Sequence, residues 1–289
     1  MENPSEISAK ELRFYAEKYN VRHSTGDLTP TVCELFGVRL PKECGATAVP
    51  EVVDQAGHLM NGEGKCQKAL LYCPDAWGAI QGERFPEERA RVEELAGFRV
   101  ECATVMPSVT PVCFGTIFSG ASPEVHGIRK YEKPVLAVET LFDVLAEAGL
   151  NVAIVAVNDC SIDRIFRQRK IDYFSFRNDA LSFAETRRLI AESDYDVIVS
   201  YMTGYDATAH KVGPWGAAAV EQLRLAVKYF CQLVADTETH WRGFNRVVAF
   251  LPDHGQHPVD NETGGHGQDI PDDMRVNHYY RIRGATREM

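Results

Sequence analysis

The stretch VVAFLPDHGQ, residues 247–256, decides the fold class of this chain. It opens with five apolar residues, Val247 to Leu251, a length and composition typical of a buried β-strand. Pro252 and the polar pair Asp253 and His254 follow directly. A buried strand that ends in chemically active side chains is typical of α/β proteins, where ligands bind at the carboxyl ends of parallel strands.

Similar apolar runs recur along the rest of the chain. The other predicted strands are Ala69–Cys73, Phe98–Thr104, Val152–Val157 and Asp196–Tyr201. Helical patterns lie between the strands, at Pro86–Leu95, Val112–Phe118, Val138–Ala148 and Trp215–Trp241. Strands that alternate with helices predict an α/β fold with a mostly parallel central sheet and helices on both faces.

Residues 1–66 precede the first of these strands. They carry an amphipathic helix pattern at Ala9–Tyr19 and a second helix start at Thr29 and Pro30. We expect residues 1–66 to form a helical extension that packs on one α/β domain, residues 67–289.

Composition limits the class of protein and its partners. A chain of 289 residues with 45% hydrophobic and 25% charged residues is globular and large enough to bury a core. With 31 basic and 41 acidic residues the net charge is -10, which disfavours a nucleic-acid polymer as partner because phosphates need clustered Lys and Arg. The sequence leaves the oligomeric state open.

The sequence also predicts a cytoplasmic address. The N-terminal residues MENPSE have neither the basic nor the apolar part of a signal peptide, and no apolar run reaches the ~18 residues of a membrane helix. The eight cysteines are scattered and form no CxxC pair, so we expect reduced thiols. No membrane partner is expected.

Ligand-type side chains follow three predicted strands, and one more lies in a glycine-rich segment. They are Asp75, Asp206, His210, Asp253, His254 and His266. Each has an ordinary alternative: a turn or cap residue, a solvated pair one helical turn apart, or a loop residue. Together they offer oxygen and imidazole without thiolate, which suits Zn²⁺ or Mn²⁺, and two such ions roughly 4 Å apart suit phosphoryl chemistry.

Thr110, followed by Pro111, stands at the predicted start of a helix. Its hydroxyl can serve as an ordinary N-cap. It can also be a nucleophile, but only if something activates it, and a neighbouring metal ion would do so. The surrounding ligand set favours the nucleophile.

A family resemblance rests on residues 106–128, MPSVTPVCFGTIFSGASPEVHGI. This segment resembles the nucleophile segment of the nucleotide pyrophosphatase/phosphodiesterase group of the alkaline phosphatase superfamily, with Thr110 on the catalytic threonine. Further blocks of that group recur in order. They are the strand-end Asp75, Asp-x-x-x-His at 206–210 with Lys-x-Gly-Pro at 211–214, Asp-His-Gly at 253–255 and Gly-x-His-Gly-x-Asp at 264–269.

The resemblance implies an alkaline phosphatase-like fold and a phosphoesterase that holds two divalent ions, with zinc favoured and manganese the alternative. By position, Asp75, Asp253, His254 and the Thr110 oxygen would hold one ion. The other would be held by Asp206, His210 and His266. The family mechanism is attack of the threonine on phosphorus, which gives a phosphothreonine intermediate that water then hydrolyses. The substrate would be a small phosphorylated molecule, and two ions would make the pocket locally positive despite the net charge.

The chain departs from the family pattern near the phosphate. Ala76 and Trp77 follow the first Asp where a glycine is usual, and Tyr131 replaces an asparagine that donates to a phosphoryl oxygen. A phosphodiesterase or nucleotide pyrophosphatase is therefore the leading prediction. The alternatives are a phosphomonoesterase, a phosphonate hydrolase and a metal-binding homologue without turnover.

The predicted substrate contacts are Lys130, Tyr131, Trp77 and Phe114. The aromatic rings could stack on a base or an aromatic leaving group, with ordinary core packing as the alternative. Arg164, Arg167 and Arg169 could bind a second anionic group, or form a solvated basic helix face.

Overall fold

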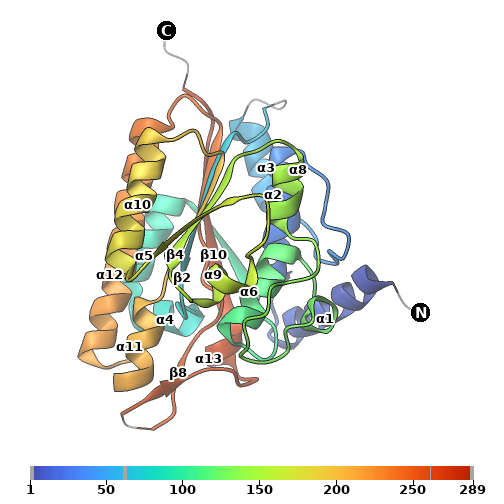
Figure 1. Ribbon diagram of the computed structural model, residues 1–289. Coiled ribbons are helices and arrows are strands. Elements are labelled where there is room, and N and C mark those ends of the chain that lie inside the picture. Colours follow the sequence, from blue (N-terminus) through green and yellow to red (C-terminus); the bar gives the residue numbers. More distant parts are fainter. Residues whose placement is uncertain (1–2, 61–63, 261, 287–289) are drawn as a thin grey trace.

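The structure is a computed structural model that describes residues 3–60, 64–260 and 262–286 (Figure 1). Its centre is an eight-stranded sheet in the order β1-β3-β10-β7-β2-β6-β4-β5. The strands of this sheet are β1 His23–Ser24, β2 Lys68–Pro74, β3 Phe98–Ala103, β4 Val152–Val157, β5 Asp172–Phe176, β6 Val197–Met202, β7 Arg246–Phe250 and β10 Arg275–Arg283. Among the described strands of this sheet, only the pairings of β10 are antiparallel, so the predicted mostly parallel sheet is confirmed.

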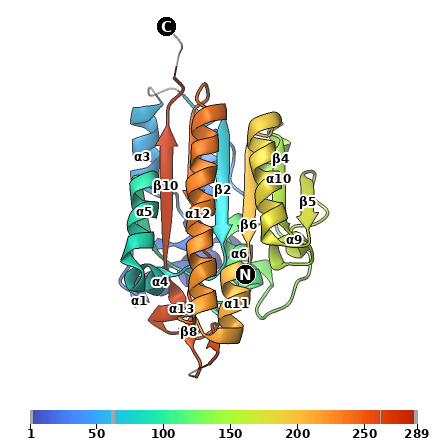
Figure 2. The same cartoon turned by 90° about the vertical axis from the view of Figure 1, so that its left-hand side faces the viewer.

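Helices cover both faces of the sheet, as predicted (Figure 1). One face packs against α1 Pro4–Lys18, η1 Thr25–Asp27, α2 Leu28–Phe36, α3 Pro50–Leu59, α6 Thr110–Ser119, α7 Pro123–His126, α8 Leu141–Glu147 and α9 Ser161–Ile165. The other face carries α4 Ala79–Arg84, α5 Pro86–Ala96, α10 Asp179–Glu192, α11 Gly204–Val212 and α12 Ala217–His240. In Figure 2 the long helix α12 crosses in front of the sheet between β10 and β2. The two faces bury two separate apolar clusters, as expected for a sheet between two helical layers.

Local sequence explains several of these elements. Every residue of β2 is buried, because helices cover the strand on both faces. Helix α5 begins at Pro86, whose fixed φ suits the first helical position, and ends before Gly97, which adopts φ 82°. The described part of residues 1–66 supplies α1 to α3, which pack into the first apolar cluster, and β1, which pairs in parallel with β3 at the edge of the sheet.

Three strands of the main sheet, β1, β5 and β10, were not predicted from the sequence. β10 runs antiparallel between β3 and β7, and β5 forms one edge of the sheet. In β10 polar residues interrupt the apolar ones: Tyr280 and Ile282 reach one core cluster and Tyr279 the other. Such a strand has no continuous apolar run, which is the signal that identified the other strands.

A small two-stranded ribbon lies beyond the main sheet. It pairs β8 His257–Pro258 with β9 Gly264–Gly265, and the short helix α13 Pro271–Met274 leads from it into β10. No helix in the described ranges is long and apolar enough to cross a membrane. All eight cysteines are free thiols, six of them buried, as the sequence predicts.

The register of the central strands aligns their carboxyl ends. Tyr72 of β2 lies opposite Phe250 of β7, and Cys73 lies opposite Tyr201 of β6. One residue after β2, the Asp75 N–H donates to the Met202 carbonyl at 2.9 Å. The residues that follow β2, β6 and β7 therefore meet at one edge of the sheet.

Candidate functional site

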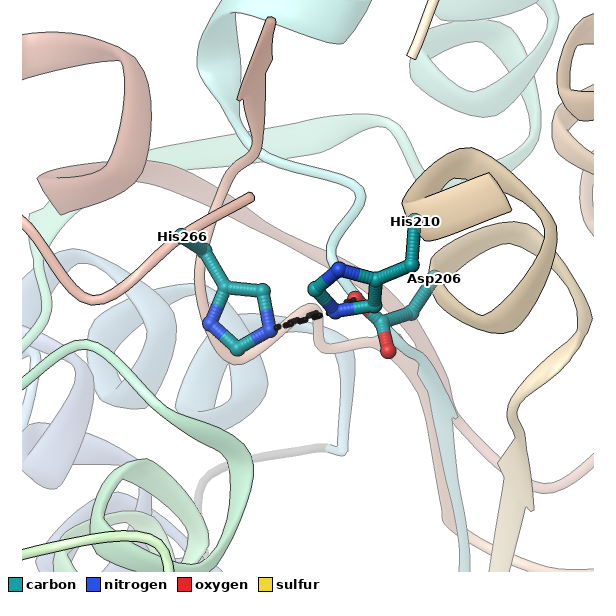
Figure 3. A group of neighbouring side chains, drawn as sticks. All are labelled: Asp206, His210 and His266. Carbon is teal, nitrogen blue, oxygen red and sulfur yellow. Dashed lines mark hydrogen bonds and ion pairs between the residues drawn. The ribbon is translucent and has the colours of Figure 1, made fainter. Parts of the chain in front are cut away.

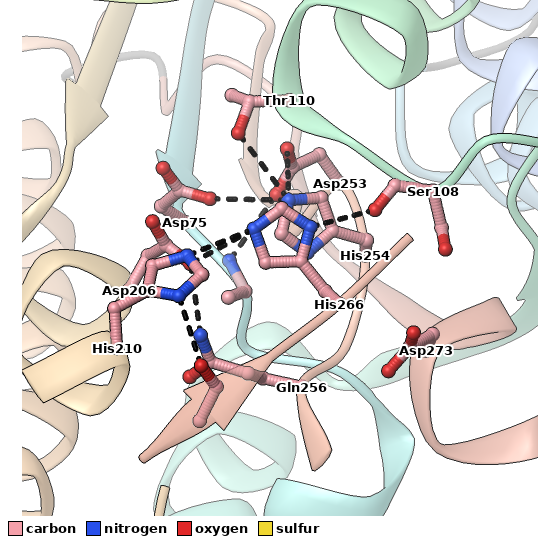
Figure 4. Close-up of polar contacts among 12 residues, drawn as sticks. Asp75, Ser108, Thr110, Asp206, His210, Asp253, His254, Gln256, His266 and Asp273 are labelled. Atoms are coloured by element: carbon pink, nitrogen blue, oxygen red, sulfur yellow. Dashed lines mark hydrogen bonds and ion pairs between the residues drawn. The ribbon is translucent and has the colours of Figure 1, made fainter. Parts of the chain in front are cut away.

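The carboxyl edge of the sheet gathers the ligand-type residues predicted from the sequence (Figure 4). Asp75 follows β2, and Asp253 and His254 follow β7. Helix α11, which follows β6, carries Asp206 and His210 one turn apart, and His266 follows β9. The six residues form two groups of three, and in each group the ligand atoms lie within 4.8 Å of one another.

The first cluster consists of Asp75, Asp253 and His254, all buried. Nε2 of His254 lies 3.3 Å from Oδ2 of Asp253 and 3.5 Å from Oδ1 of Asp75. Thr110 is the first residue of α6, after Val109 at the N-cap position, so the alternative of an ordinary threonine N-cap is wrong. Its Oγ1 lies 3.3 Å from Nε2 of His254, beside the cluster.

Each carboxylate of the first cluster has one oxygen bonded to the protein. The Tyr201 hydroxyl donates to Oδ2 of Asp75, and the Ala76 N–H donates to Oδ1 of Asp253 at 3.2 Å. The other oxygens, Oδ1 of Asp75 and Oδ2 of Asp253, are buried without a hydrogen-bond partner among the described residues. Unpartnered buried carboxylate oxygens are costly in a folded protein unless a cation meets them.

The second cluster consists of Asp206, His210 and His266 (Figure 3). Oδ1 of Asp206 lies 3.3 Å from Nε2 of His210 and 3.4 Å from Nε2 of His266, and the two Nε2 atoms are 3.1 Å apart. Gln256 donates from Nε2 to the same oxygen of Asp206 at 3.1 Å. The rings of His266 and His254 stack with centroids 4.0 Å apart, so the two clusters are neighbours.

The three histidines share one arrangement of their rings. Each Nδ1 faces a backbone carbonyl: Gly255 for His254 at 2.9 Å, Gly264 for His210 at 3.0 Å and Ser108 for His266 at 2.8 Å. An Nδ1–H that donates to a carbonyl leaves the lone pair on Nε2, which is the usual state of a metal-binding histidine. All three Nε2 lone pairs then point into the clusters, and two of them oppose each other unless a cation lies between them.

The two clusters differ in the physical cause of their pKa shifts. In the first, burial, with the Asp253 carboxylate next, raises the pKa of Asp75 well above its usual value. Burial also raises the pKa of Asp253 to about 7 and lowers that of His254 to about 3. Burial disfavours charge on all three side chains, so the cluster lacks positive charge of its own.

In the second cluster the groups stabilise one another. Burial acts to raise the pKa of Asp206, but hydrogen bonds from His210 and His266 outweigh it and hold this pKa below its usual value. The bond to Asp206 raises the pKa of His210, and it does the same for His266 against the opposing effect of burial. Without a metal ion, these interactions favour the charged forms of all three side chains.

Both clusters fit a divalent metal ion. Their donors are carboxylate oxygens and imidazole nitrogens without thiolate, the set that suits zinc or manganese. The first cluster offers two unpartnered oxygens and the second offers converging Nε2 atoms.

The predicted substrate contacts lie in different surroundings. Trp77 and Phe114 are completely buried. Trp77 packs edge-on against Phe250, and Phe114 lies between Phe118 and Tyr201. The core encloses both rings in this structure. Neither ring can therefore stack on a substrate, although the sequence had suggested it.

The remaining predicted contacts are on the surface or in ion pairs. Tyr131 is 61% exposed, and Lys130 pairs with Glu132 beside it. The three arginines pair within the protein, Arg164 with Asp159, Arg167 with Asp163 and Arg169 with Asp143. Ion pairs within the protein therefore account for the three arginines, and no second anion site is needed to explain why they lie close together in the sequence.

Sequence reasoning missed the residues that hold the clusters in place. Tyr201 lies inside a buried strand, where an apolar run gives no sign of a functional hydroxyl. Gln256 follows the Asp-His-Gly block and could have been noticed, but only as a polar neighbour. The carbonyls that fix the histidine rings belong to backbone that no sequence motif reveals.

The family of the chain follows from a comparison with family models. The model for type I phosphodiesterase / nucleotide pyrophosphatase matches residues 92–285, more than half of the chain. The chain therefore belongs to the type I phosphodiesterase / nucleotide pyrophosphatase family, a family of hydrolases that act on phosphoric ester bonds. The matched residues include Thr110 and five of the six cluster residues, and Asp75 lies before them.

Solved structures share the fold. Murine ectonucleotide pyrophosphatase/phosphodiesterase 5, an inactive form in complex with AMP, matches with a TM-score of 0.52 and 15% identity over 66% of this chain and 57% of that chain. Human ectonucleotide pyrophosphatase/phosphodiesterase 5 matches with a TM-score of 0.54 and 14% identity, over 66% of this chain and 57% of that chain.

A bacterial enzyme gives a similar match. Phosphonoacetate hydrolase from Sinorhizobium meliloti 1021, in complex with phosphonoacetate, has a TM-score of 0.51 and 20% identity over 68% of this chain and 58% of that chain. The chain thus spans less than two thirds of the length of these proteins. Among curated proteins no sequence matches the chain significantly.

Proposed function

We propose that this chain is a metal-dependent hydrolase of small phosphoric esters, of the phosphodiesterase or nucleotide pyrophosphatase type, with Thr110 as its nucleophile. One observation carries the proposal. The Thr110 hydroxyl lies 3.3 Å from Nε2 of His254, at the start of α6 and beside two adjoining clusters of metal-ligand type. A hydroxyl is a weak nucleophile at its ordinary pKa and needs such a neighbourhood to react.

Two divalent ions are part of the proposal, with zinc favoured over manganese. Asp75, Asp253, His254 and the Thr110 oxygen would hold one ion, and Asp206, His210 and His266 the other. When bound, the ions supply positive charge that stabilises the attacking and leaving oxygens of an in-line displacement.

The residues of the chain then carry out two displacements. Oγ1 of Thr110, having lost its proton, attacks phosphorus; the bond from phosphorus to the leaving alcohol breaks, and the alcohol takes up a proton. A water molecule next breaks the phosphothreonine bond, leaving its hydroxyl on phosphorus and its proton on Oγ1. The start of α6 favours the anionic phosphoryl group near Thr110 through the helix dipole.

Exposure suggests the side from which substrate enters. Thr110 and the first cluster are buried, whereas the His210 side chain is 42% exposed. A phosphoryl group would therefore reach Thr110 past the second cluster. The net charge of -10 disfavours a nucleic-acid polymer as substrate, and the free thiols support a cytoplasmic, reducing environment.

Substitution of Thr110 tests the nucleophile. Thr110→Ala should abolish cleavage of bis-p-nitrophenyl phosphate while the purified protein keeps close to two equivalents of metal. Thr116→Ala is the matched control, because Thr116 lies in the same helix, is buried and bonds to His126 instead. Turnover that survives in Thr110→Ala, or a wild-type protein without metal after growth in zinc or manganese, would contradict the proposal.

A substrate panel separates the leading activity from its alternatives. Tyr131 stands where the family pattern has asparagine and is largely exposed, which keeps a phosphomonoesterase or a phosphonate hydrolase as the second candidate. Mono- and bis-p-nitrophenyl phosphate, a nucleotide ester and phosphonoacetate should be compared by kcat/KM. We expect the diester or the nucleotide ester to be preferred. A protein that binds metal but cleaves none of them would be a homologue without turnover.

A further inference from the structure

We propose that Tyr201 is a positioning residue for the first metal ion: its hydroxyl holds Oδ2 of Asp75 and so leaves Oδ1 as the oxygen that meets the ion. This inference deepens the proposed function and rests on its metal site. Tyr201 lies outside the six ligand-type residues and Thr110.

The hydroxyl of Tyr201 reaches Asp75 because of strand pairing. Tyr201 of β6 lies opposite Cys73 of β2, two residues before Asp75. The Asp75 N–H is also bonded to the carbonyl of Met202, the neighbour of Tyr201. The backbone of Asp75 and the donor to its side chain are thus both fixed by the end of β6.

The ring of Tyr201 is itself held in place. Its side chain is buried, and Phe114 of α6 packs edge-on against it with centroids 5.2 Å apart. Phe114 lies one helical turn after Thr110, so the helix that carries the nucleophile also packs on the tyrosine. A ring enclosed in this way cannot turn its hydroxyl elsewhere without disturbing the core.

The chemistry of the donor suits a cation site. Tyr201 donates one hydrogen bond to Oδ2, whereas Oδ1 has no partner among the described residues and lies 3.5 Å from Nε2 of His254. A phenol fixes the carboxylate without adding charge, so the negative charge stays available to an ion. A lysine or arginine at this place would neutralise that charge and compete with the ion.

A purely structural role makes a different prediction. Tyr72 is a matched control on the neighbouring strand β2: it is buried, and its hydroxyl donates to the Ala226 carbonyl at 3.0 Å, away from both clusters. Tyr→Phe at either position removes one buried hydrogen bond. If Tyr201 only stabilised the fold, both variants would behave alike.

The experiment measures metal affinity on the full chain. In a His210→Ala background, which weakens the second cluster, Zn²⁺ is titrated against a chromophoric chelator. We expect Tyr201→Phe to weaken zinc binding at the first cluster about 10- to 100-fold, the range typical of residues that orient metal ligands. Tyr72→Phe should leave the affinity unchanged within about 2-fold, although the thermal midpoints of both metal-free variants fall.

Visible absorption of the cobalt-substituted protein provides a second measurement. Tyr201→Phe frees Oδ2 of Asp75, so its cobalt spectrum should change where that of Tyr72→Phe does not. If Tyr201→Phe fails to fold, Phe114→Leu loosens the ring while keeping the hydroxyl, and it should weaken zinc binding by a smaller factor in the same titration.

The outcomes separate this inference from the proposed function. Equal zinc affinities in Tyr201→Phe and Tyr72→Phe, in a chain that binds zinc and cleaves esters, would overturn only the role of Tyr201. A chain that binds zinc with the expected difference but cleaves nothing would support Tyr201 and overturn the proposed hydrolysis. A wild-type chain that binds neither zinc nor manganese would overturn both.

Discussion

The two clusters at the carboxyl edge of the sheet differ in how they balance their charges. Asp75, Asp253 and His254 are buried at the ends of strands β2 and β7. The second cluster lies on helix α11 and the loop after β9, and its His210 is half-exposed. In the first cluster, burial disfavours every charge, whereas in the second a carboxylate and two imidazoles stabilise one another. The first cluster therefore has no positive group to balance its carboxylates, whereas the second pairs its carboxylate with two imidazoles.

The largest expected effect is on metal affinity at the buried cluster. Asp253→Ala removes a completely buried ligand-type carboxylate, and we expect zinc binding at the first cluster to fall more than about 100-fold. His210→Ala removes a side chain that water can replace, so binding at the second cluster should fall by less, about 10- to 100-fold. Chelator competition measures both. Equal losses would remove the distinction between the clusters.

Replacing an aspartate of each cluster by asparagine should change the stability of the metal-free protein in opposite directions. Asp253→Asn should stabilise the protein, and Asp206→Asn should destabilise it. Burial raises the pKa of Asp253 to about 7, above the ~4 of an unfolded aspartate, so the folded chain keeps a proton that the unfolded chain has released. The stability that this proton contributes is lost as the pH rises from about 4 to 7. Asp253→Asn cannot ionise and should raise the free energy of unfolding at pH 8, by on the order of 2 kcal/mol.

Asp206→Asn should do the reverse. The pKa of Asp206 is lowered, so its charged form contributes stability above pH ~4, and this contribution is lost as the pH falls through the folded value. The raised pKa values of His210 and His266 make the charge pairs strongest below pH ~6.5. At pH 6 we expect Asp206→Asn to lower the free energy of unfolding of the metal-free protein by about 1 kcal/mol. Denaturant unfolding of both variants after metal removal decides whether the signs differ.

The smallest expected effect on metal affinity concerns the support of helix α11. Asp179 of α10 accepts hydrogen bonds from the N–H groups of Thr203 and Gly204, where α11 begins, at 3.1 and 2.7 Å. Asp179→Ala should weaken zinc binding at the second cluster by about 10-fold and leave the first cluster unchanged. Asp179→Ala keeps all three ligand-type residues of the second cluster, so a loss of affinity would come from a shift of helix α11.

A matched substitution controls for lost helix capping. Asp143 caps α8 through Thr140, and α8 carries no cluster residue. Asp143→Ala should cost a similar stability, about 1 kcal/mol, without changing zinc affinity. If zinc binding fell equally in both variants, the support of α11 by Asp179 would be an effect of general destabilisation.

The fold was predictable where burial leaves a continuous apolar run. β2, β4, β6 and β7 have helices on both faces, so nearly all of their residues are apolar and the sequence marks them. β10 was not predicted, because Arg281 and Arg283 interrupt its apolar residues. The Arg281 side chain donates hydrogen bonds to Glu238 and to the Leu95 carbonyl. That compensation comes from distant parts of the chain, which periodicity cannot show.

The residues of the candidate site and their division into two groups were predictable from the family motifs, but their hydrogen bonds and pKa shifts were not. Asp75, Asp253 and His254 follow buried strands, and the register of β2, β6 and β7 brings strand ends together in any such sheet. Trp77 and Phe114 show the limit: both are near the ligand-type residues in sequence, yet the core encloses them. A side chain next to a strand end can point to either face of the sheet, and packing decides which.

The sequence by itself determined the alternation of strands and helices, the family motifs and the types of side chain that end each strand, because these depend on local order and composition. Only the tertiary structure decided which hydrogen bonds each of those side chains makes and how burial shifts its pKa. It also placed the Tyr201 hydroxyl and three backbone carbonyls within hydrogen-bond distance of the ligand-type side chains. Burial and hydrogen bonding depend on residues far apart in the chain, so they become visible only when the strands lie side by side.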